Sequence, residues 1–348
     1  MGEENLIEKN TGKKLTIADI ADALGVSKTT VSRSISGKGR IGAKTKQRVL
    51  DYIEEYGYQP NMVAKGLAQS KTYNICVACP SDYNVGDLIF FQHCLMGITK
   101  KAAEMEYDIV MAMVNNEDIS QLERIVRNHK ADGVILMRTT IEDASIAFLK
   151  NNALPFVAIG NAAPDVVQVD NDNRSACKSM TELLLNQGMK RLALIGGDTT
   201  HMVTRSRYAG YEDAFRELGI PMEEDLVFLD ADRDGNLGKD VEAAMAKKPD
   251  CIVCIDDTVC VGVLSKFRDD GIRVPDDMRV ASFYHSAQLD YHEPPITTLK
   301  FDANLLGATA CSCLISHLRD GEPLEGHIIL EYELLQRGST VDYIKKKS

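Results

Sequence analysis

From residue 73 onwards, short apolar runs alternate with longer amphipathic stretches. The runs are NICVAC, DIVMAM, GVILM, FVAIG and VVQV, then LALIGG, LVFL, CIVCI and RVASF, with a return through PITTLKFD to a last strand, IILEYELL, at 328–335. Helices are expected between them at about 89–106, 118–129, 142–152, 173–187, 203–218, 236–247, 257–270 and 303–319. Fully apolar strands alternating with helices are typical of parallel sheets covered on both faces. The repeated scheme predicts two doubly wound subdomains, with a ligand site in the cleft at the carboxyl ends of the strands.

The first 72 residues follow a different pattern. Residues 1–14 have no apolar period and are predicted to form a disordered tail, whereas residues 15–59 predict three short helices. Thr16 and Asp19 have the spacing of a capping box, and Gly25 follows the last apolar residue of that helix. Ser27 is placed to cap a second helix, and a third is expected at 43–56. Three helices with a short turn between the first two predict an all-α helix-turn-helix head.

The net charge of the chain also changes sign between these first residues and the rest. The net charge is −11, but residues 1–71 carry +4 and residues 72–348 carry −15. A basic head on an acidic body indicates a polyanionic partner for the head alone.

The second helix has only two apolar residues, Val31 and Ile35, in the stretch SKTTVSRSISG. Its outer face then carries hydroxyls and positive charges, which can meet phosphate oxygens and base edges of DNA. A solvated helix of accidental composition is the alternative, although poor helix formers on an exposed face need a reason to be there.

Several motifs make a family resemblance explicit. The head contains GVSKTTVSR, the junction YQPN and the hinge AKGL; the body contains VDND at 169–172, RLALIGG at 191–197, RYAGYEDAF at 207–215, GIRVPDDMRVASF at 271–283 and PPITTLKFD at 294–302. Over about residues 15–340 the chain resembles the LacI/GalR (lactose repressor / purine repressor) family of bacterial transcription regulators. The resemblance implies a hinge helix or linker at 60–72 and a type I periplasmic-binding-protein-like core at 73–340. It divides this core into an N-subdomain at about 73–172 and 303–331 and a C-subdomain at about 173–302 and 332–341.

The resemblance also assigns roles in DNA binding. Bases of the major groove would be read by Lys28, Thr29 and Arg33, while phosphates would be held by Ser27, Thr30 and Ser32. In the hinge, the implied minor-groove residues are Asn61, Ala64 and Leu67, with the leucine inserted at the operator centre.

Effector contacts are implied at eight positions of the cleft: Asp87, Phe90, Arg138, Asn161, Arg207, Asp257, Tyr284 and His285. Gly160, Tyr284 and His285 stand where many members place aspartates, and Arg138 is unusual at its position. Fewer carboxylates and an added arginine and histidine favour an anionic ligand, such as a sugar phosphate or a sugar acid. A neutral sugar held by Asp87 and Asp257 is the alternative.

Two CxxC pairs, Cys76/Cys79 and Cys251/Cys254, occur among nine cysteines. Both lie in strand-like apolar runs, where residues three apart point to opposite faces, so core packing is favoured over a metal site. The sequence predicts no metal, cofactor or catalytic group, and without a signal peptide or apolar span it predicts a cytoplasmic protein.

These observations predict a sequence-specific DNA-binding transcriptional regulator, following the family precedent a repressor, that acts as a homodimer on a pseudo-palindromic operator under the control of a small sugar-like effector. A tetramer stays open, and so does the direction of the effector's action. A solute-binding protein without a DNA role is the alternative, and an α/β enzyme on this scaffold lacks a nucleophile or base to nominate.

Overall fold

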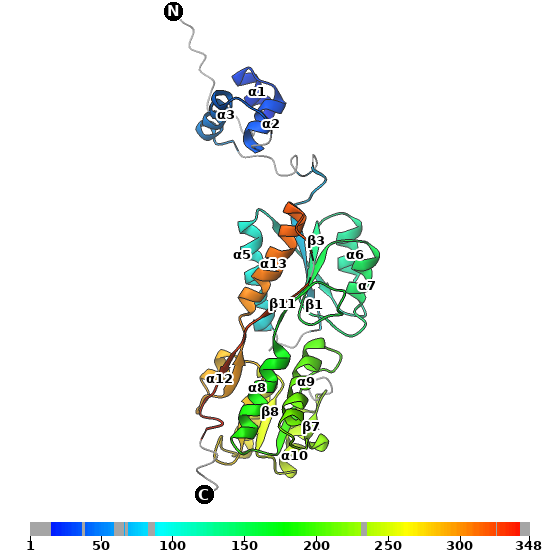
Figure 1. Cartoon of the computed structure of the whole chain (residues 1–348), viewed down its shortest axis with the longest axis vertical. Helices are drawn as coiled ribbons and strands as arrows, with labels where there is room; N and C mark the ends of the chain where they lie inside the picture. The colour runs from blue at the N-terminus through cyan, green and yellow to red at the C-terminus, as the bar shows by residue number, and fades with distance from the viewer. Residues whose placement is uncertain are drawn as a thin grey trace, which may run out of the picture. The chain divides into compact units, whose positions relative to one another are not determined.

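The computed structural model (Figure 1) describes residues 15–36, 39–58, 66, 69–82, 88–230, 235–324 and 326–341. The chain divides into two units, Met1–Lys71 and Thr72–Ser348. The predicted tail at 1–14, the hinge residues Asn61, Ala64 and Leu67, and the effector candidate Asp87 lie outside the described residues.

The head unit contains the three predicted helices: α1 (Ile17–Leu24), α2 (Lys28–Ser36) and α3 (Ala43–Tyr56). The capping box at the start of α1 is confirmed, because the Thr16 hydroxyl accepts from the Asp19 N–H and the Asp19 carboxylate accepts from the Thr16 N–H at 2.8 Å. Gly25 ends α1 with a φ of 64°, a left-handed conformation that favours glycine. Ile20, Val31 and Val49, one from each helix, form the buried centre of this small core.

The second unit contains two six-stranded sheets. The first has the strand order β11-β5-β4-β3-β1-β2, and all its recorded pairings are parallel. Its strands are β1 (Asn74–Pro80), β2 (Asp108–Val114), β3 (Gly133–Leu136), β4 (Phe156–Ile159), β5 (Gln168–Asn171) and β11 (His327–Leu330). Helices α5 (Leu88–Glu104) and α13 (Ala303–Asp320) cover one face, and α6 (Ser120–Arg127) and α7 (Ala144–Asn151) cover the other (Figure 1).

The second sheet has the order β12-β10-β9-β8-β6-β7. Its strands are β6 (Leu192–Ile195), β7 (Val227–Phe228), β8 (Cys251–Cys254), β9 (Arg279–Ser282), β10 (Thr297–Lys300) and β12 (Glu333–Leu335). The helices of this half are α8 (Asn173–Asn186), α9 (Met202–Glu217), α10 (Leu237–Ala246), α11 (Asp257–Asp270) and α12 (Ala287–Asp290), with a 3-10 turn at Glu224–Leu226. The predicted architecture of a helix-turn-helix head and two doubly wound subdomains is confirmed.

Glycines set the close approach of helices in both halves. A Cβ at Gly97 of α5 would lie 1.9 Å from the Asn304 carbonyl oxygen of α13, and one at Gly307 would lie 2.1 Å from the Cys94 carbonyl oxygen. A Cβ at Gly210 of α9 would meet the Arg174 carbonyl oxygen of α8 at 2.2 Å. Larger residues would therefore force these helix pairs apart.

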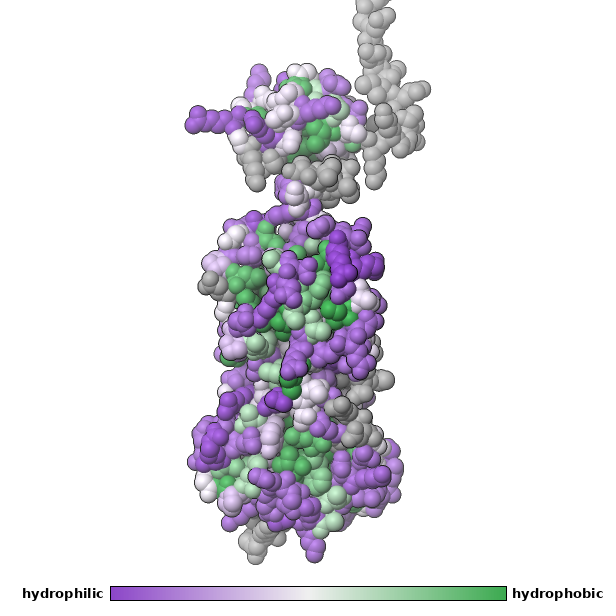
Figure 2. Space-filling model, turned by 90° about the vertical axis from the view of Figure 1, so that its right-hand side faces the viewer, coloured by the Kyte–Doolittle hydropathy of each residue, from purple (hydrophilic) through white to green (hydrophobic). Residues whose placement is uncertain are grey.

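The sequence prediction was wrong about the end of the fold. The run 328–335, predicted as one strand, is two strands in different sheets: β11 pairs with β5, while β12 pairs antiparallel with β10. The prediction of strands buried on both faces also fails at β2, because β2 lies at a sheet edge and leaves Met111 about half exposed. On the face shown in Figure 2, both halves of the second unit carry hydrophilic residues with hydrophobic areas between them.

The cysteines of both CxxC pairs are free, and all four are buried, as predicted. Cys76 packs in the cluster on the α6 and α7 side of the first sheet, while Cys79 packs in the cluster on the α5 and α13 side. The two thiols therefore point to opposite faces of β1. Within the described ranges, no helix is long and apolar enough to cross a membrane.

Candidate functional site

Helix α2 buries one side and exposes the other. Val31 is fully buried and Ile35 partly buried in the head core. Ser27 caps the helix, since its hydroxyl accepts from the Thr30 N–H at 3.1 Å and lies 2.8 Å from the Thr30 hydroxyl. Two of the hydroxyls assigned to phosphate are thus hydrogen-bonded to each other at the start of the helix.

The exposed side of α2 consists of Lys28, Thr29, Ser32 and Arg33. Lysine and arginine have donors that match phosphate oxygens and guanine edges, and the hydroxyls can donate or accept. The stem of Arg33 passes beside Gly39, which has a φ of 91° and whose added Cβ would lie 3.2 Å from the arginine Cδ. The structure therefore brings together the three predicted base-reading side chains on one accessible surface.

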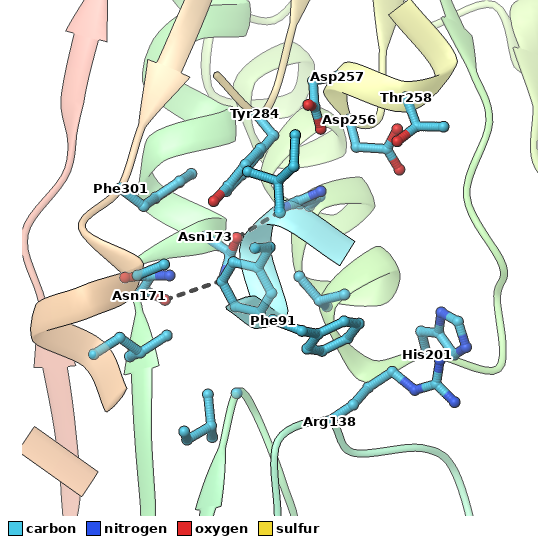
Figure 3. A pocket seen from close by; sticks show the side chains of 18 of the residues that line it. Phe91, Arg138, Asn171, Asn173, His201, Asp256, Asp257, Thr258, Tyr284 and Phe301 are labelled. Atoms are coloured by element: carbon cyan, nitrogen blue, oxygen red, sulfur yellow. Dashed lines mark hydrogen bonds between the residues drawn. The ribbon is translucent and has the colours of Figure 1, made fainter. Parts of the chain in front are cut away.

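In the second unit, a cavity of about 700 Å³ lies between the carboxyl ends of the two sheets (Figure 3). Its first-half wall includes Arg138 and Asn171, which follow or end β3 and β5. Its second-half wall includes Asp256 and Tyr284, which follow β8 and β9. This location agrees with the rule that open α/β sheets bind ligands at the carboxyl ends of their strands.

Aromatic rings line part of this cavity. Tyr284 stacks against Phe301 with ring centres 6.0 Å apart and meets Phe90 edge-on at 5.9 Å. Phe90 in turn meets Phe91 edge-on at 5.3 Å. Such a wall offers apolar faces to a ligand while polar groups elsewhere fix its orientation.

Arg207 of α9 is held in place by groups at the cavity wall. Its Nε donates to Asn173 Oδ1 at 3.2 Å and its Nη1 donates to the Ile255 carbonyl at 2.8 Å. The guanidinium also lies over the Tyr284 ring, 5.6 Å from its centre. These contacts orient a planar cation towards the ligand space.

Three aspartates near Arg207 have raised pKa values. Burial raises the pKa of Asp170 to about 7, against hydrogen bonds from the Asn171 N–H and the Asn173 amide. Burial, with a contribution from the neighbouring Asp256 carboxylate, raises the pKa of Asp257 to about 6. Burial also raises the pKa of Asp256, which caps α11 through the Val259 N–H. Asp170 and Asp257 can therefore exchange protons with a ligand near neutral pH.

Arg138 lies elsewhere on the cavity wall. One end of its guanidinium forms an ion pair with Asp82, and the side chain is only 11% exposed. Burial, followed by the positive charge of Arg138, lowers the pKa of His201, which is therefore mainly neutral at pH 7. Figure 3 shows Arg138 and His201 side by side, away from Asp256 and Asp257.

Buried polar atoms of the cavity wall without a hydrogen-bond partner within the described part of the chain include Arg138 Nη1, Asn171 Oδ1 and Thr258 Oγ1. A buried polar group without a partner is costly, so these atoms indicate where ligand groups belong.

The halves also touch directly beside the cavity. Thr140 and His201 form an isolated antiparallel bridge, in which the Ile141 N–H donates to the Thr200 carbonyl at 3.0 Å. Next to it, the Met202 N–H donates to the Thr139 carbonyl at 3.3 Å. The segment after β3 is thus joined to the start of α9 by backbone hydrogen bonds.

Six predicted effector residues line the cavity: Phe90, Arg138, Arg207, Asp257, Tyr284 and His285. Asn161 does not; its amide donates to Ser206 Oγ at 2.9 Å and its carbonyl accepts from the Thr139 hydroxyl. His285 lies 3.1 Å from the Thr298 hydroxyl through Nδ1, and burial lowers its pKa.

The cavity contains carboxyl groups beyond the two that the sequence pointed to. Five aspartates line it: Asp82, Asp170, Asp198, Asp256 and Asp257. Four of them had no predicted role, although each lies near or just after the end of a strand, and this position was the signal that could have found them. No cluster of three or more His, Cys, Asp or Glu able to hold a metal occurs in the part of the chain that the structure describes.

Comparison with known proteins gives a match for each of the two units. Residues 16–61 match the family model for bacterial regulatory proteins, lacI family, and residues 181–340 match that for a periplasmic binding protein-like domain. The chain is 30% identical over 333 residues to the HTH-type transcriptional regulator RegA of Clostridium saccharobutylicum, covering 94% of this chain and 99% of that protein. The chain belongs to the lacI family of bacterial regulatory proteins. It is a DNA-binding transcriptional regulator with a small-molecule cavity in its core.

Other similarities extend over the same length. The catabolite control protein A of Staphylococcus xylosus is 27% identical over 331 residues, covering 94% of this chain and 99% of that protein. Among solved structures, the lac repressor dimer bound to operator and the anti-inducer ONPF superposes with a TM-score of 0.74 at 23% identity, covering 94% of this chain and 99% of that one. A LacI-type putative regulator from Bacillus cereus subsp. cytotoxis has a TM-score of 0.71 at 28% identity, covering 76% of this chain and 98% of that one.

Proposed function

We propose that this lacI-family protein represses transcription by placing two α2 helices on a pseudo-palindromic operator, and that a sugar-like effector in the cavity controls its affinity for that DNA. The observation that carries the DNA-reading part is the exposed face formed by Lys28, Thr29 and Arg33 opposite the buried Val31. Base contacts there would supply sequence selectivity, and hydroxyls of Ser27, Thr30 and Ser32 would hold phosphates.

The experiment is a gel shift with DNA from upstream of the protein's own gene. We expect sequence-selective binding that weakens steeply with salt, because phosphate contacts release counterions. Arg33→Ala should abolish selective binding while leaving cavity ligands bound, since the two sites lie in separate units. Arg127→Ala removes an exposed arginine of the core and is the matched control. Absence of selective binding in every effector state would reject the proposal.

The cavity supports a carbohydrate as the effector. Its aromatic wall suits the apolar face of a sugar ring, and Arg207 with Asp257 can bind hydroxyls. Asn171 Oδ1 needs a donor and Thr258 Oγ1 needs a partner of either kind, and sugar hydroxyls provide both. The direction of the response can be read from the same gel shift, as release of DNA for an inducer or tighter binding for a corepressor.

The more specific part of the proposal is that the effector is anionic, a sugar phosphate or a sugar acid. Isothermal titration with neutral sugars and with their phosphates and acids tests it. Micromolar or tighter binding of a neutral sugar alone would reject the anionic class and keep the regulator.

A homodimer is proposed as the working state. Ile89 and Met96 on α5 and Leu305 on α13 are large apolar side chains exposed on two helices that pack together. A second copy covering these helices would bury them. Light scattering on the eluting protein would distinguish dimer from tetramer. We also propose that the protein works in the cytoplasm, where its operator DNA lies. The cavity is proposed to bind its ligand without catalysing a reaction.

A further inference from the structure

A single carboxylate holds the backbone where the chain enters the second unit. Asp132 Oδ1 accepts from the Thr72 N–H at 2.7 Å and from the Thr72 hydroxyl at 2.9 Å. Asp132 Oδ2 accepts from the Tyr73 N–H at 2.9 Å. Hydrogen bonds to an ionised acceptor are stronger than those between neutral groups. Both oxygens of this carboxylate thus bind the two residues that begin the unit.

Further hydrogen bonds join the same place to the segment that contains Asp132. The Asn74 N–H donates to the Thr72 hydroxyl at 3.1 Å, and the Asn74 side-chain amide donates to the Lys130 carbonyl at 3.0 Å. The Asp132 N–H donates to the Asn74 carbonyl at 2.8 Å. The start of β1 is therefore fixed to the segment that leads from α6 into β3.

Tyr73 has a backbone conformation that tyrosine rarely adopts. Its φ is 56°, in the left-handed region that favours glycine. Its ring packs against the core of the first half, with its centre 5.5 Å from that of the Tyr107 ring. A conformation of this kind persists only where the surroundings impose it, and it is more frequent at functional sites than elsewhere. Here the ring contact and the Asp132 carboxylate impose it.

The segment that contains Asp132 also leads to the cavity. Asp132 directly precedes β3, whose four residues are all buried and which pairs with β1 on one side and β4 on the other (Figure 1). Met137 and Arg138, which follow β3, line the cavity. A buried strand that is hydrogen-bonded on both sides is among the most stable parts of a fold, so its two ends keep a fixed separation.

We propose that Asp132 is a positioning residue for DNA binding, because by holding Thr72 and Tyr73 it fixes the direction in which the chain leaves the core towards the head. We call these three residues the Asp132 clamp. The chain passes from one unit to the other only once, between Lys71 and Thr72, so the clamp acts at their single covalent connection.

This inference rests on the proposed function and names the residue through which a change at the cavity wall reaches the DNA-reading helices. Without the clamp, the residues before β1 would lack a fixed direction. The two heads of a dimer would then lose more conformational entropy on reaching their half-sites, and specific binding would weaken.

The first experiment measures the clamp in the full chain. Asp132→Ala removes all three hydrogen bonds, so hydrogen exchange at residues 72–74, followed by mass spectrometry, should become faster by roughly tenfold or more. Asp118→Ala is the matched control, because the Asp118 carboxylate also accepts from a backbone N–H of the first half, that of Ser120 at 2.8 Å. The control should leave exchange at residues 72–74 unchanged, and an unchanged rate in Asp132→Ala would overturn the clamp.

The second experiment is a gel shift with DNA from upstream of the protein's own gene and with unrelated DNA. Asp132→Ala should weaken binding to the upstream DNA by roughly tenfold, the usual effect of losing a hydrogen bond to a charged group. Binding to unrelated DNA should stay as in the wild type, because it depends on phosphate contacts of the head alone. A purely structural role of Asp132 would weaken both kinds of binding alike and would overturn the positioning role.

Variants of Thr72 test the same contact from the other partner and keep the test decisive if Asp132→Ala folds poorly. Thr72→Val removes the hydroxyl that donates to Asp132, whereas Thr72→Ser keeps it. We expect the valine variant to lose affinity for the upstream DNA and the serine variant to bind like the wild type. In a protein that already carries Asp132→Ala, Thr72→Val should cost less affinity than it does alone, because the contact is already absent.

The gel shift separates failure of the clamp from failure of the proposed function. A wild type that selects no DNA refutes the proposed function. A selective wild type whose Asp132→Ala and Thr72→Val variants bind the upstream DNA equally well refutes the positioning role and leaves the regulator standing.

Discussion

Asp170→Asn should make the core unit more stable, and increasingly so as the pH rises. Asp170 is 6% exposed, and burial raises its pKa from 3.8 to about 7. In the unfolded chain the carboxyl group ionises near pH 4, whereas in the fold it keeps its proton until about pH 7. The folded state therefore binds more protons in this window, and its stability falls as the pH rises from about 4 to 7.

The size of the effect follows from the pKa difference. About three pKa units correspond to about 4 kcal/mol at pH 8, of which about 1.5 kcal/mol is already present at pH 5. Asparagine cannot ionise, and its side-chain oxygen can still accept from the Asn171 N–H and the Asn173 amide, now 2.8 and 3.2 Å from Asp170 Oδ1. For a unit of this size we expect the midpoint of thermal unfolding to rise by roughly 8 °C at pH 8 and roughly 3 °C at pH 5.

The assay is thermal unfolding of both proteins without sugars, across pH 5 to 8 at constant ionic strength. Asp165→Asn is the control, because Asp165 is exposed and paired with Lys150. The control should change little at any pH. An Asp170→Asn protein that melts at or below the wild-type temperature at pH 8, or a difference that does not depend on pH, would refute the reasoning.

Three further variants test the packing, the cavity and the hinge. Gly97→Ala should destabilise the core by about 3 kcal/mol or more, because its Cβ would overlap the Asn304 carbonyl, and urea unfolding with an unchanged midpoint would contradict this. Arg207→Lys loses the planar contacts to Asn173 and to the Ile255 carbonyl, so we expect operator binding to persist in a gel shift but no longer to respond to the sugars that act on the wild type. Leu67→Ala should weaken the specific complex and reduce DNA bending, and an unchanged bend angle would count against minor-groove insertion.

Local signals were enough to predict the head and the class of the core. The capping box of Thr16 and Asp19, the cap at Ser27 and the glycine at position 25 act within a few residues, so the ends of α1 and the start of α2 could be read directly. Alternating apolar runs and helices determined the two doubly wound halves, because strands covered on both faces must be apolar throughout.

Only the tertiary structure decided how distant segments meet. The apolar pattern of the run 328–335 indicates a single strand, and only the family resemblance divides it between subdomains; in the fold its two ends pair with strands of different sheets. The raised pKa of Asp170 depends on its burial in the folded chain, and the segments that carry Arg138 and His201 meet only in the fold, through the backbone bridge between Thr140 and His201. The residue types at the strand ends therefore indicated where a ligand would bind. Burial and long-range contacts then determined the charge of the cavity wall and which polar groups stay available to a ligand.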